Sequence, residues 1–504
     1  MNGNSNGNSA VIEELQWEVG LVNLAGRYLT AEQFGFKINA SATSLRKKQR
    51  WVIEHGEEDV VYIRSHLGRY LSGDKKGNVT CCSETKGQQE QFVIEYCPKN
   101  SGRWAIRNRY TSYYFGGNED FLQCYEKEPT SAEWWSAHLA VHPQINLRNV
   151  NRKTFARLEH DSLVCSETIP WGCDSLITIE WKGNEKEAKY AVKSADNRYL
   201  QNNGELSQNS SSATLYRIEL RSGQNGGLAF KDKDGKYLTA VGKGKIQAKN
   251  KTISRDELFV LQDSHPQGVV TAHNGKNVSI RQGVSLSANQ ERTEDEETHQ
   301  IEFDKGTGGW LFRAGNGKLW TVVSAGIEAT ASKKSIETLF DLEYFSDGWM
   351  AVKARANDKY LTARGTGSLS ASSSYKDGDT ERFLFTMINR PIIVLRTEYG
   401  FMGCKTVNNP KIECNKTSYD TLYLETVNGQ YFIKAMTNGE YHYWAVATDN
   451  SLNADSSEPY PFYLEHSSQS KFVIRTPENV YLKCEQNGTV TAKASRQTAT
   501  QIEY

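Results

Sequence analysis

The sequence contains 504 residues, of which 38% are hydrophobic and 24% charged, proportions typical of folded globular domains. Its 60 basic and 60 acidic side chains cancel, which excludes a net positive field that would draw the whole protein onto nucleic acid or an anionic membrane. No stretch is apolar over the length required to span a bilayer. We therefore expect neither a nucleic-acid partner nor membrane insertion.

The N-terminal segment is polar and rich in Asn, Gly and Ser, and we predict a disordered tail over residues 1–18. It lacks the basic and apolar regions of a secretory signal. Nine cysteines occur at irregular spacings without a C-x-x-C pair, which favours free thiols in a reducing compartment over disulfides or a zinc site. We therefore expect a cytoplasmic protein.

A short phrase, Gly26-Arg27-Tyr28-Leu29, recurs along the whole chain. Turn residues precede each copy and a small residue follows most copies 10 to 12 positions later, which predicts a unit of about four β-strands. Neighbouring copies lie 38 to 44 residues apart, so the chain holds twelve repeats of about 41 residues. The positions aligned with Tyr28 are Tyr70, Tyr114, Phe155, Tyr199, Tyr237, Val278, Leu319, Tyr360, Phe401, Tyr443 and Tyr481.

Prolines mark every third repeat. Pro143, Pro266 and Pro391 lie 123 and 125 residues apart. Four strands per repeat also fit the blades of a β-propeller, but a ring of twelve blades exceeds the usual four to eight. We therefore predict an all-β fold of four tandem β-trefoil domains with three repeats each. Their expected boundaries are 19–142, 143–265, 266–390 and 391–504.

The sequence carries no signature of an enzyme. It lacks a phosphate-binding loop, a dinucleotide fingerprint, a serine-hydrolase elbow and a metalloprotease helix. A recurrent carboxylate follows the aromatic phrase that closes several repeats, which predicts hydrogen bonding or solvent exposure at strand ends rather than a catalytic pair. These carboxylates are Glu54, Glu95, Glu219, Glu343 and Glu465. We expect no catalytic residue, no cofactor and no metal site.

Several basic clusters depart from the repeat pattern. Between Lys236 and Arg255 the chain has six basic residues and no acidic one, and the first repeat carries Arg46-Lys47-Lys48 in its second half. A single cluster of this kind is compatible with an ordinary solvated strand face. Several clusters in different domains of a neutral protein favour an extended acidic partner that is bound at more than one place.

Several longer motifs occur in a fixed order along the chain. They are Gly35 to Ser41, Arg64 to Leu71, Tyr114 to Gly117, Ile169 to Gly172, Asp256 to Phe259, Leu286 to Gln290 and Ile388 to Ile393. In sequence and order they resemble the fascins, from about residue 18 to the C-terminus. Fascins are cytosolic, actin-bundling proteins built of four β-trefoils.

The resemblance implies a function and a set of site residues. It implies a monomer that cross-links parallel F-actin through at least two surfaces, in filopodia and other cell protrusions, with one surface enclosed by the first and fourth trefoils. Matching motif positions imply actin contacts at Lys47, Lys48, Arg152, Lys153, Lys359 and Lys471, and a second basic surface at Lys243, Lys245, Lys249 and Lys251. Ser44 matches the regulatory phosphorylation site, which implies a protein kinase as a further partner.

The sequence departs from the fascin pattern at Thr154, Arg364-Gly365 and Tyr399. Tyr399 takes the place of a histidine that could titrate. The alternative hypothesis is a lectin-like carbohydrate-binding protein, since many β-trefoils bind sugars. Such trefoils repeat a Gln-x-Trp motif, which occurs here once, as Gln49-Arg50-Trp51.

Overall fold

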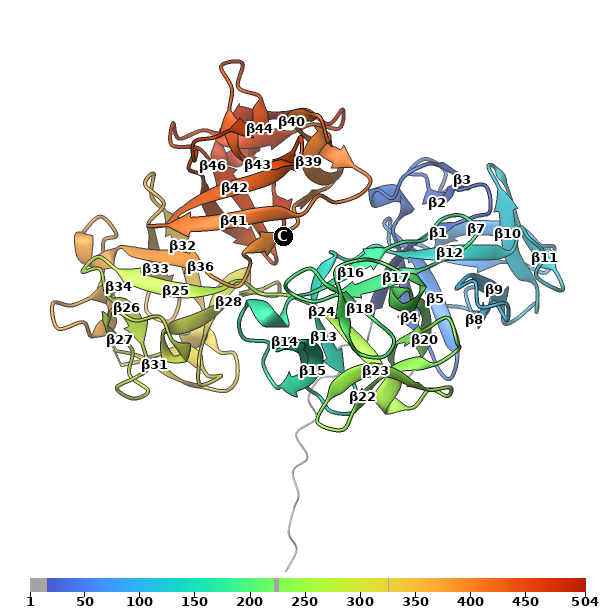
Figure 1. The fold of residues 1–504 in the computed structure, drawn as a ribbon, viewed down its shortest axis with the longest axis horizontal. Coiled ribbons are helices and arrows are strands. Elements are labelled where there is room, and N and C mark those ends of the chain that lie inside the picture. The colour runs from blue at the N-terminus through green and yellow to red at the C-terminus, as the bar shows by residue number, and fades with distance from the viewer. Residues whose placement is uncertain (1–15, 222–225, 325) are drawn as a thin grey trace, which may run out of the picture. The chain divides into compact units, whose positions relative to one another are not determined.

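The computed structural model describes residues 16–221, 226–324 and 326–504 (Figure 1). Within these ranges the chain forms β-strands and short 3₁₀ turns and contains no α-helix. Residues 1–15 of the predicted tail lie outside the described residues, and strand β1 begins at Gln16, before the predicted end of the tail at residue 18. Strand pairing groups the strands into four sets in chain order.

The first set is a six-stranded barrel with three hairpins. Its elements are β1 (Gln16–Val22), β2 (Tyr28–Ala31), β3 (Ile38–Ala42), η1 (Lys47–Gln49), β4 (Trp51–His55), β5 (Val60–Ser65), β6 (Tyr70–Gly73), β7 (Val79–Ser83), β8 (Phe92–Tyr96), β9 (Trp104–Asn108), β10 (Tyr114–Asn118), β11 (Phe121–Glu126) and β12 (Trp134–Leu139). Strands β1, β4, β5, β8, β9 and β12 pair in a closed ring, and β2–β3, β6–β7 and β10–β11 are the hairpins. Closure leaves the barrel without a free edge.

The second set repeats this arrangement. Its elements are β13 (Gln144–Asn149), β14 (Phe155–Glu159), β15 (Ser162–Glu167), η2 (Cys173–Ser175), β16 (Ile177–Trp181), β17 (Tyr190–Lys193), β18 (Tyr199–Leu200), β19 (Leu206–Ser207), η3 (Ser212–Thr214), β20 (Arg217–Arg221), β21 (Gly227–Lys231), β22 (Tyr237–Val241), β23 (Lys245–Asn250), η4 (Arg255–Glu257) and β24 (Phe259–Asp263). A bridge between Tyr190 and Tyr216 completes the ring between β17 and β20.

The third set also closes. Its elements are β25 (Gln267–Ala272), β26 (Asn277–Ser279), β27 (Ser287–Gln290), η5 (Asp295–Glu297), β28 (Thr298–Asp304), β29 (Gly309–Ala314), β30 (Leu319–Val323), β31 (Gly326–Ala331), η6 (Ile336–Thr338), β32 (Phe340–Tyr344), β33 (Met350–Ala354), β34 (Lys359–Ala363), β35 (Leu369–Ser373), η7 (Asp379–Glu381) and β36 (Phe383–Met387). Strand β25 pairs with both β28 and β36, so the last strand returns to the first.

The fourth set differs in its first strand, which is broken in two. Its elements are β37 (Ile392–Ile393), β38 (Arg396–Thr397), β39 (Gly400–Thr406), β40 (Asn409–Lys416), β41 (Leu422–Val427), β42 (Gln430–Thr437), β43 (Glu440–Val446), β44 (Leu452–Ser456), β45 (Tyr463–Ser468), β46 (Lys471–Arg475), β47 (Tyr481–Cys484), β48 (Val490–Ala494), η8 (Arg496–Thr498) and β49 (Ile502–Glu503). A closed barrel with three hairpins in each set is a β-trefoil, which confirms the predicted fold class; the domain boundaries stay a prediction.

The repeat position of Tyr28 has a structural role in most units, because the strand pairing shifts by one residue directly after it. The shift falls between Tyr28 and Leu29, and between Tyr237 and Leu238. A bulge of this kind bends the hairpin over the end of the barrel. In the seventh unit the shift follows Asn277, so Asn277 and not Val278 is the equivalent residue, and our alignment was wrong there by one position.

The recurrent carboxylates bind the repeat tyrosines. The phenol-to-carboxylate distances are 3.0 Å for Tyr70–Glu54, 2.7 Å for Tyr114–Glu95, 3.0 Å for Tyr237–Glu219, 2.8 Å for Tyr360–Glu343 and 3.0 Å for Tyr481–Glu465. Burial by itself would raise the pKa of Glu54, but hydrogen bonds from Arg64, Lys86 and Tyr70 lower it overall. These glutamates therefore join one unit to the next, as expected of a structural role.

The chain forms two compact units. Of the described residues, the first contains those up to Pro143, Leu147–Thr168 and Ile177–Gln262, and the second contains Gln144–Asn146, Ile169–Leu176 and Asp263–Tyr504. Within the first unit the indole of Trp104 donates to the carbonyl of Ile218 at 3.2 Å, which links the first and second trefoils.

In the second unit the buried Arg390 links three parts of the chain. Its guanidinium donates to the carbonyls of Ser264 at 2.7 Å and His265 at 3.2 Å. It also lies 4.7 Å from the ring of Tyr504, a cation–π contact. Because Arg390 sits between β36 and β37, it ties the start of the third trefoil to the end of the fourth.

Candidate functional site

The first predicted patch lies between β3 and β4, on the 3₁₀ turn η1. Gln49 is buried there; its Oε1 accepts the backbone N–H of Arg46 at 3.1 Å, and its Nε2 donates to Thr30 Oγ1 at 3.0 Å. These bonds fix the turn, since a buried amide that loses its partners costs about 1–3 kcal/mol. Lys47 and Lys48, on the same turn, are exposed.

The two lysines of this patch have different surroundings. The Lys48 ammonium lies 2.8 Å from Glu32 Oε2, and this hydrogen bond lowers the pKa of the Glu32 carboxyl. Across the part of the chain that the structure describes, no ion pair involves Lys47. The pKa of nearby His66 is lowered by burial first, and then by the charges of Lys47 and Lys48. Lys47 is thus the more available cation.

Ser44 precedes this patch by three positions. It is half-buried in the loop between β3 and η1. The next residue, Leu45, packs over Gly20, where an added Cβ would lie 2.6 Å from the leucine Cδ1. Leu45 therefore anchors the loop of Ser44 to β1.

The second predicted patch is formed by two segments of the second trefoil. Arg152 and Lys153 occupy the loop between β13 and β14, while Lys243 and Lys245 belong to the hairpin β22–β23. The guanidinium of Arg152 donates from Nε to the carbonyl of Ala240 at 3.1 Å and from Nη2 to that of Gly242 at 2.7 Å. The structure therefore unites two sets of residues that the sequence analysis assigned to different surfaces.

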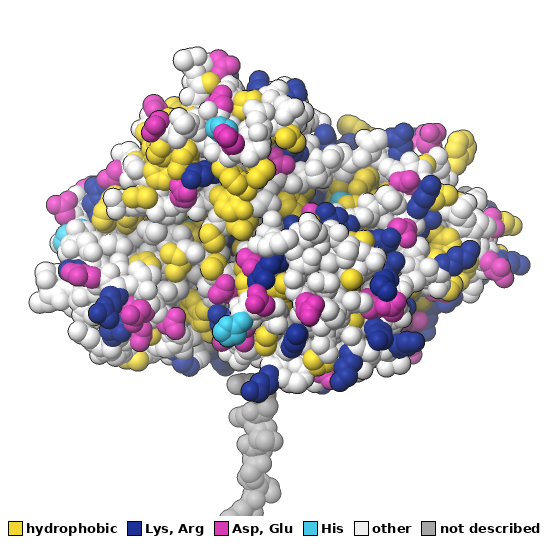
Figure 2. Space-filling view, in the orientation of Figure 1, with side chains coloured by type: hydrophobic (Ala, Val, Ile, Leu, Met, Phe, Trp, Pro, Cys, Tyr) yellow, Lys and Arg dark blue, Asp and Glu magenta, His cyan; other side chains and the backbone are white. Residues whose placement is uncertain are grey.

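Among the residues that the structure describes, the positive charges of the lysines in this second patch have no acidic partners. Lys153, Lys243, Lys249 and Lys251 are exposed, and Lys245 is half-buried. Within the described ranges none of them forms an ion pair with a carboxylate. Figure 2 shows Lys and Arg side chains gathered over the region where Figure 1 labels β22 and β23. This surface suits an acidic partner.

Lys359 and Lys471 belong to the second unit. Lys359 begins β34, and its ammonium donates to Ser374 Oγ at 2.7 Å. Lys471 begins β46 and lies opposite Glu503 of β49 in the strand pairing. Both are half-buried, and they lie in different trefoils. The structure therefore does not gather them into one cluster.

Asn149 shapes the loop of Arg152 but was not among the predicted site residues. Asn149 is fully buried; its Nδ2 donates to the Asp256 carbonyl at 2.9 Å, and its Oδ1 accepts the backbone N–H of Arg152 at 2.9 Å. A signal was present in the repeat, because Asn, Asp or Ser precedes the repeat aromatic by five or six positions in several units. Asn23, Asn108 and Asp232 make equivalent bonds to backbone amides.

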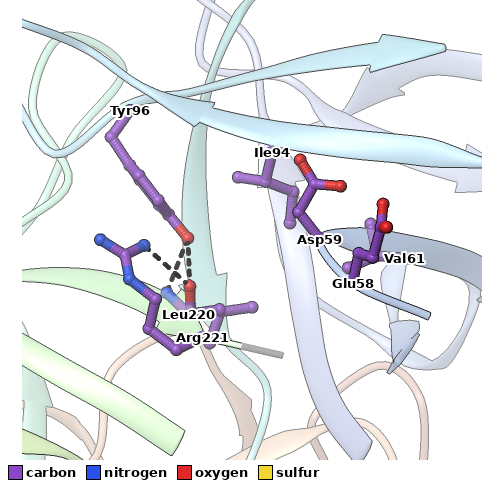
Figure 3. A pocket seen from close by; sticks show the side chains of 7 residues that line it. All are labelled: Glu58, Asp59, Val61, Ile94, Tyr96, Leu220 and Arg221. Atoms are coloured by element: carbon purple, nitrogen blue, oxygen red, sulfur yellow. Dashed lines mark hydrogen bonds between the residues drawn. The ribbon is translucent and has the colours of Figure 1, made fainter. Parts of the chain in front are cut away.

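A cavity of about 210 Å³ in the first unit lies apart from the predicted site residues (Figure 3). It is lined by Glu58, Asp59, Val61, Ile94, Tyr96, Leu220 and Arg221. Tyr96 closes one side, because its hydroxyl donates to the Leu220 carbonyl at 2.9 Å and accepts the Leu220 amide at 2.7 Å. Among the described residues no cluster of three or more His, Cys, Asp or Glu side chains is arranged to hold a metal ion.

No helix in the described part of the chain is long and apolar enough to cross a membrane.

Comparisons with known proteins agree with the fold and with four domains. The family model described as Fascin domain matches four stretches of the chain, residues 25–137, 145–261, 273–385 and 399–502.

Curated relatives cover almost the whole chain. A Fascin-2 from Bos taurus is 38% identical over 95% of this chain and 96% of its own length, and the Homo sapiens Fascin-2 is 38% identical over 97% and 98%. The Fascin of Strongylocentrotus purpuratus is 33% identical over 95% of this chain and 97% of its own. With four matched domains and relatives that align nearly end to end, the chain belongs to the fascin family.

Proposed function

We propose that this protein binds and cross-links actin filaments through at least two basic surfaces. Membership of the fascin family supports actin as the partner. The observation that carries the proposal is the pair of basic patches in one compact unit, one at Lys47 and Lys48 and one at the hairpin β22–β23, whose lysines mostly lack acidic partners. Two surfaces on one body are needed for bundling, since a protein with a single surface only decorates a filament.

The proposal includes a role for the protein in the cell. We infer that the protein acts as a monomer in the cytoplasm, where it supports filopodia and similar protrusions, and that a protein kinase regulates it at Ser44. Lys359 and Lys471 contribute to actin binding from the second unit in this proposal. These points rest on the resemblance of the sequence motifs to those of fascins.

Co-sedimentation with F-actin at low and high centrifugal speed tests the proposal. We expect the protein to pellet with actin at both speeds, and bundling to weaken as ionic strength rises, because exposed charges are screened. Replacing Lys47 and Lys48 by Glu, or Lys243 and Lys245 by Glu, should abolish low-speed pelleting while retaining part of the high-speed pelleting. Lys305→Glu, an exposed lysine of the β28–β29 turn, is the control. Full bundling by both double variants would refute the proposal.

A further inference from the structure

Arg152 was expected to contact the partner directly, but its side chain is engaged within the protein. Its guanidinium donates hydrogen bonds to the carbonyls of Ala240 and Gly242, at the end of β22 and in the turn that follows it. Bonds from a guanidinium are charge-assisted and stronger than neutral ones, and its planar fork suits two acceptors held in fixed positions.

The loop that presents Arg152 is itself rigid. The buried Asn149 accepts the Arg152 amide, and the Lys153 amide donates to the Asn149 carbonyl at 3.0 Å. Asn151 Nδ2 donates to Asp256 Oδ1 at 2.7 Å, which ties the loop to η4. These hydrogen bonds therefore hold the backbone of Arg152 in one position.

The hairpin that receives these bonds needs such a tie. Its turn contains Gly242 and Gly244, both with positive φ, and no hydrophobic side chain at the tip. Besides Arg152, the tip is held by backbone pairing: the Gly244 amide donates to the Val241 carbonyl at 2.7 Å, the Cys165 amide donates to the Gly244 carbonyl at 2.8 Å, and Lys245 pairs with Val164. Lysines of like charge on the hairpin repel one another, which favours fraying of the tip.

We propose that Arg152 is a positioning residue that locks the β22–β23 hairpin and so fixes where Lys243 and Lys245 are presented to an acidic partner. The effect of Arg152 on actin binding rests on the proposed function. Its effect on the hairpin does not, because the hydrogen bonds that hold the hairpin form without a partner. It predicts that the shape of the Arg152 side chain matters, whereas a direct contact would require mainly its charge.

Hydrogen exchange of the free protein tests the locking. In Arg152→Lys and Arg152→Ala the amides of Gly244 and Cys165 should exchange about tenfold faster than in the wild type, because two bonds to a charged donor are lost. Lys153→Ala, on the same loop, should leave both amides unchanged. Wild-type exchange in Arg152→Lys would overturn the proposal, and unchanged thermal midpoints would show that the variants are folded.

Actin pelleting tests the consequence. Arg152→Lys should weaken binding about as much as Arg152→Ala, and Arg152→Ala should add little to a variant in which Lys243 and Lys245 are already Ala. Retention of wild-type binding by Arg152→Lys would overturn the positioning role in favour of a charge contact. If the variant lacking Lys243 and Lys245 binds like the wild type, the proposed function of this surface fails, while the exchange data still decide whether Arg152 locks the hairpin.

Discussion

Equivalent carboxylates of the repeat experience different environments. Glu465 is buried with Arg475, accepts Arg475 Nε at 2.9 Å and also pairs with Arg496 at 2.8 Å. Glu343 occupies the same repeat position, but its side chain is 36% exposed and its cation is the half-exposed Lys376. The same residue type thus stabilises one unit strongly and another weakly.

We expect Glu465→Gln to destabilise the protein by about 3–5 kcal/mol, since it leaves a buried guanidinium without its anion. Glu343→Gln should cost about 1 kcal/mol or less, because exposed ion pairs contribute little. Urea unfolding monitored by tryptophan fluorescence measures both. Equal shifts of the two midpoints would contradict this difference in burial.

Ser44 is the second residue whose chemistry leads to a prediction. A Glu at this position, three residues before Lys47, adds negative charge beside the two exposed lysines of η1. Ser44→Glu should weaken actin bundling about threefold to fivefold, and a phosphate with its larger charge should weaken it more. Low-speed pelleting measures the effect, with Ser44→Ala as the control. An effect that persists unchanged at high salt would argue against an electrostatic mechanism.

Among the elements, the hairpin β22–β23 shows most clearly what local sequence does not reveal. The turn residues and alternating strands of this hairpin could be predicted from sequence. Its attachment could not, because Arg152 lies in a loop and Cys165 in a strand that come about 80 to 90 residues earlier in the chain. The error at Val278 has a different cause, because the bulge follows Asn277, and an asparagine stands where the pattern has an aromatic residue.

The close approach of β23 to β15 yields a prediction at this scale. An added Cβ at Gly244 would lie 2.4 Å from the Cys165 carbonyl oxygen, and φ there is +107°. Gly242 also has positive φ, at +50°, but no atom within 4 Å. Gly244→Ala should destabilise the protein by about 3 kcal/mol and Gly242→Ala by about 1 kcal/mol. Thermal unfolding measures both losses of stability. A larger loss in Gly242→Ala than in Gly244→Ala would contradict the prediction.

For the whole molecule, the repeat period and the prolines were sufficient to predict four trefoils. They could not predict that the chain forms two units or that Gln144–Asn146 and Ile169–Leu176 belong to the second, because this grouping depends on contacts with residues far away in the chain. Nor could they show that Lys153 and Lys243 share one surface, since both patches look alike as basic runs. Long-range pairing, which leaves no trace in local sequence, decides these features.

Two fully buried histidines of the second unit make its stability depend on pH. Burial lowers the pKa of His299 to about 4, and burial together with Arg390 lowers that of His466 to about 3. In the unfolded chain histidine titrates near 6.5, so below that pH the unfolded state binds protons that the folded state does not. Stability should therefore fall as pH drops from 6.5 toward 4.

Each histidine should contribute about 1.4 kcal/mol per pH unit in this window. His299→Gln should reduce the drop in thermal midpoint between pH 7 and pH 5, whereas the exposed His160→Asn should not. An identical drop in the wild type and His299→Gln would show that other groups control acid sensitivity.

Gln144–Asn146 and Ile169–Leu176, the two segments of the second trefoil that belong to the second unit, also constrain the order in which contacts form during synthesis. Gln144 Oε1 accepts the amide of Val394 at 2.8 Å, and the Gly172 amide donates to Gln267 Oε1 at 2.8 Å. A ribosome that has released the second trefoil has not yet made Val394. The bond from the Val394 amide to Gln144 can therefore form only after the start of the fourth trefoil leaves the exit tunnel, and a translational pause before that point would delay this contact.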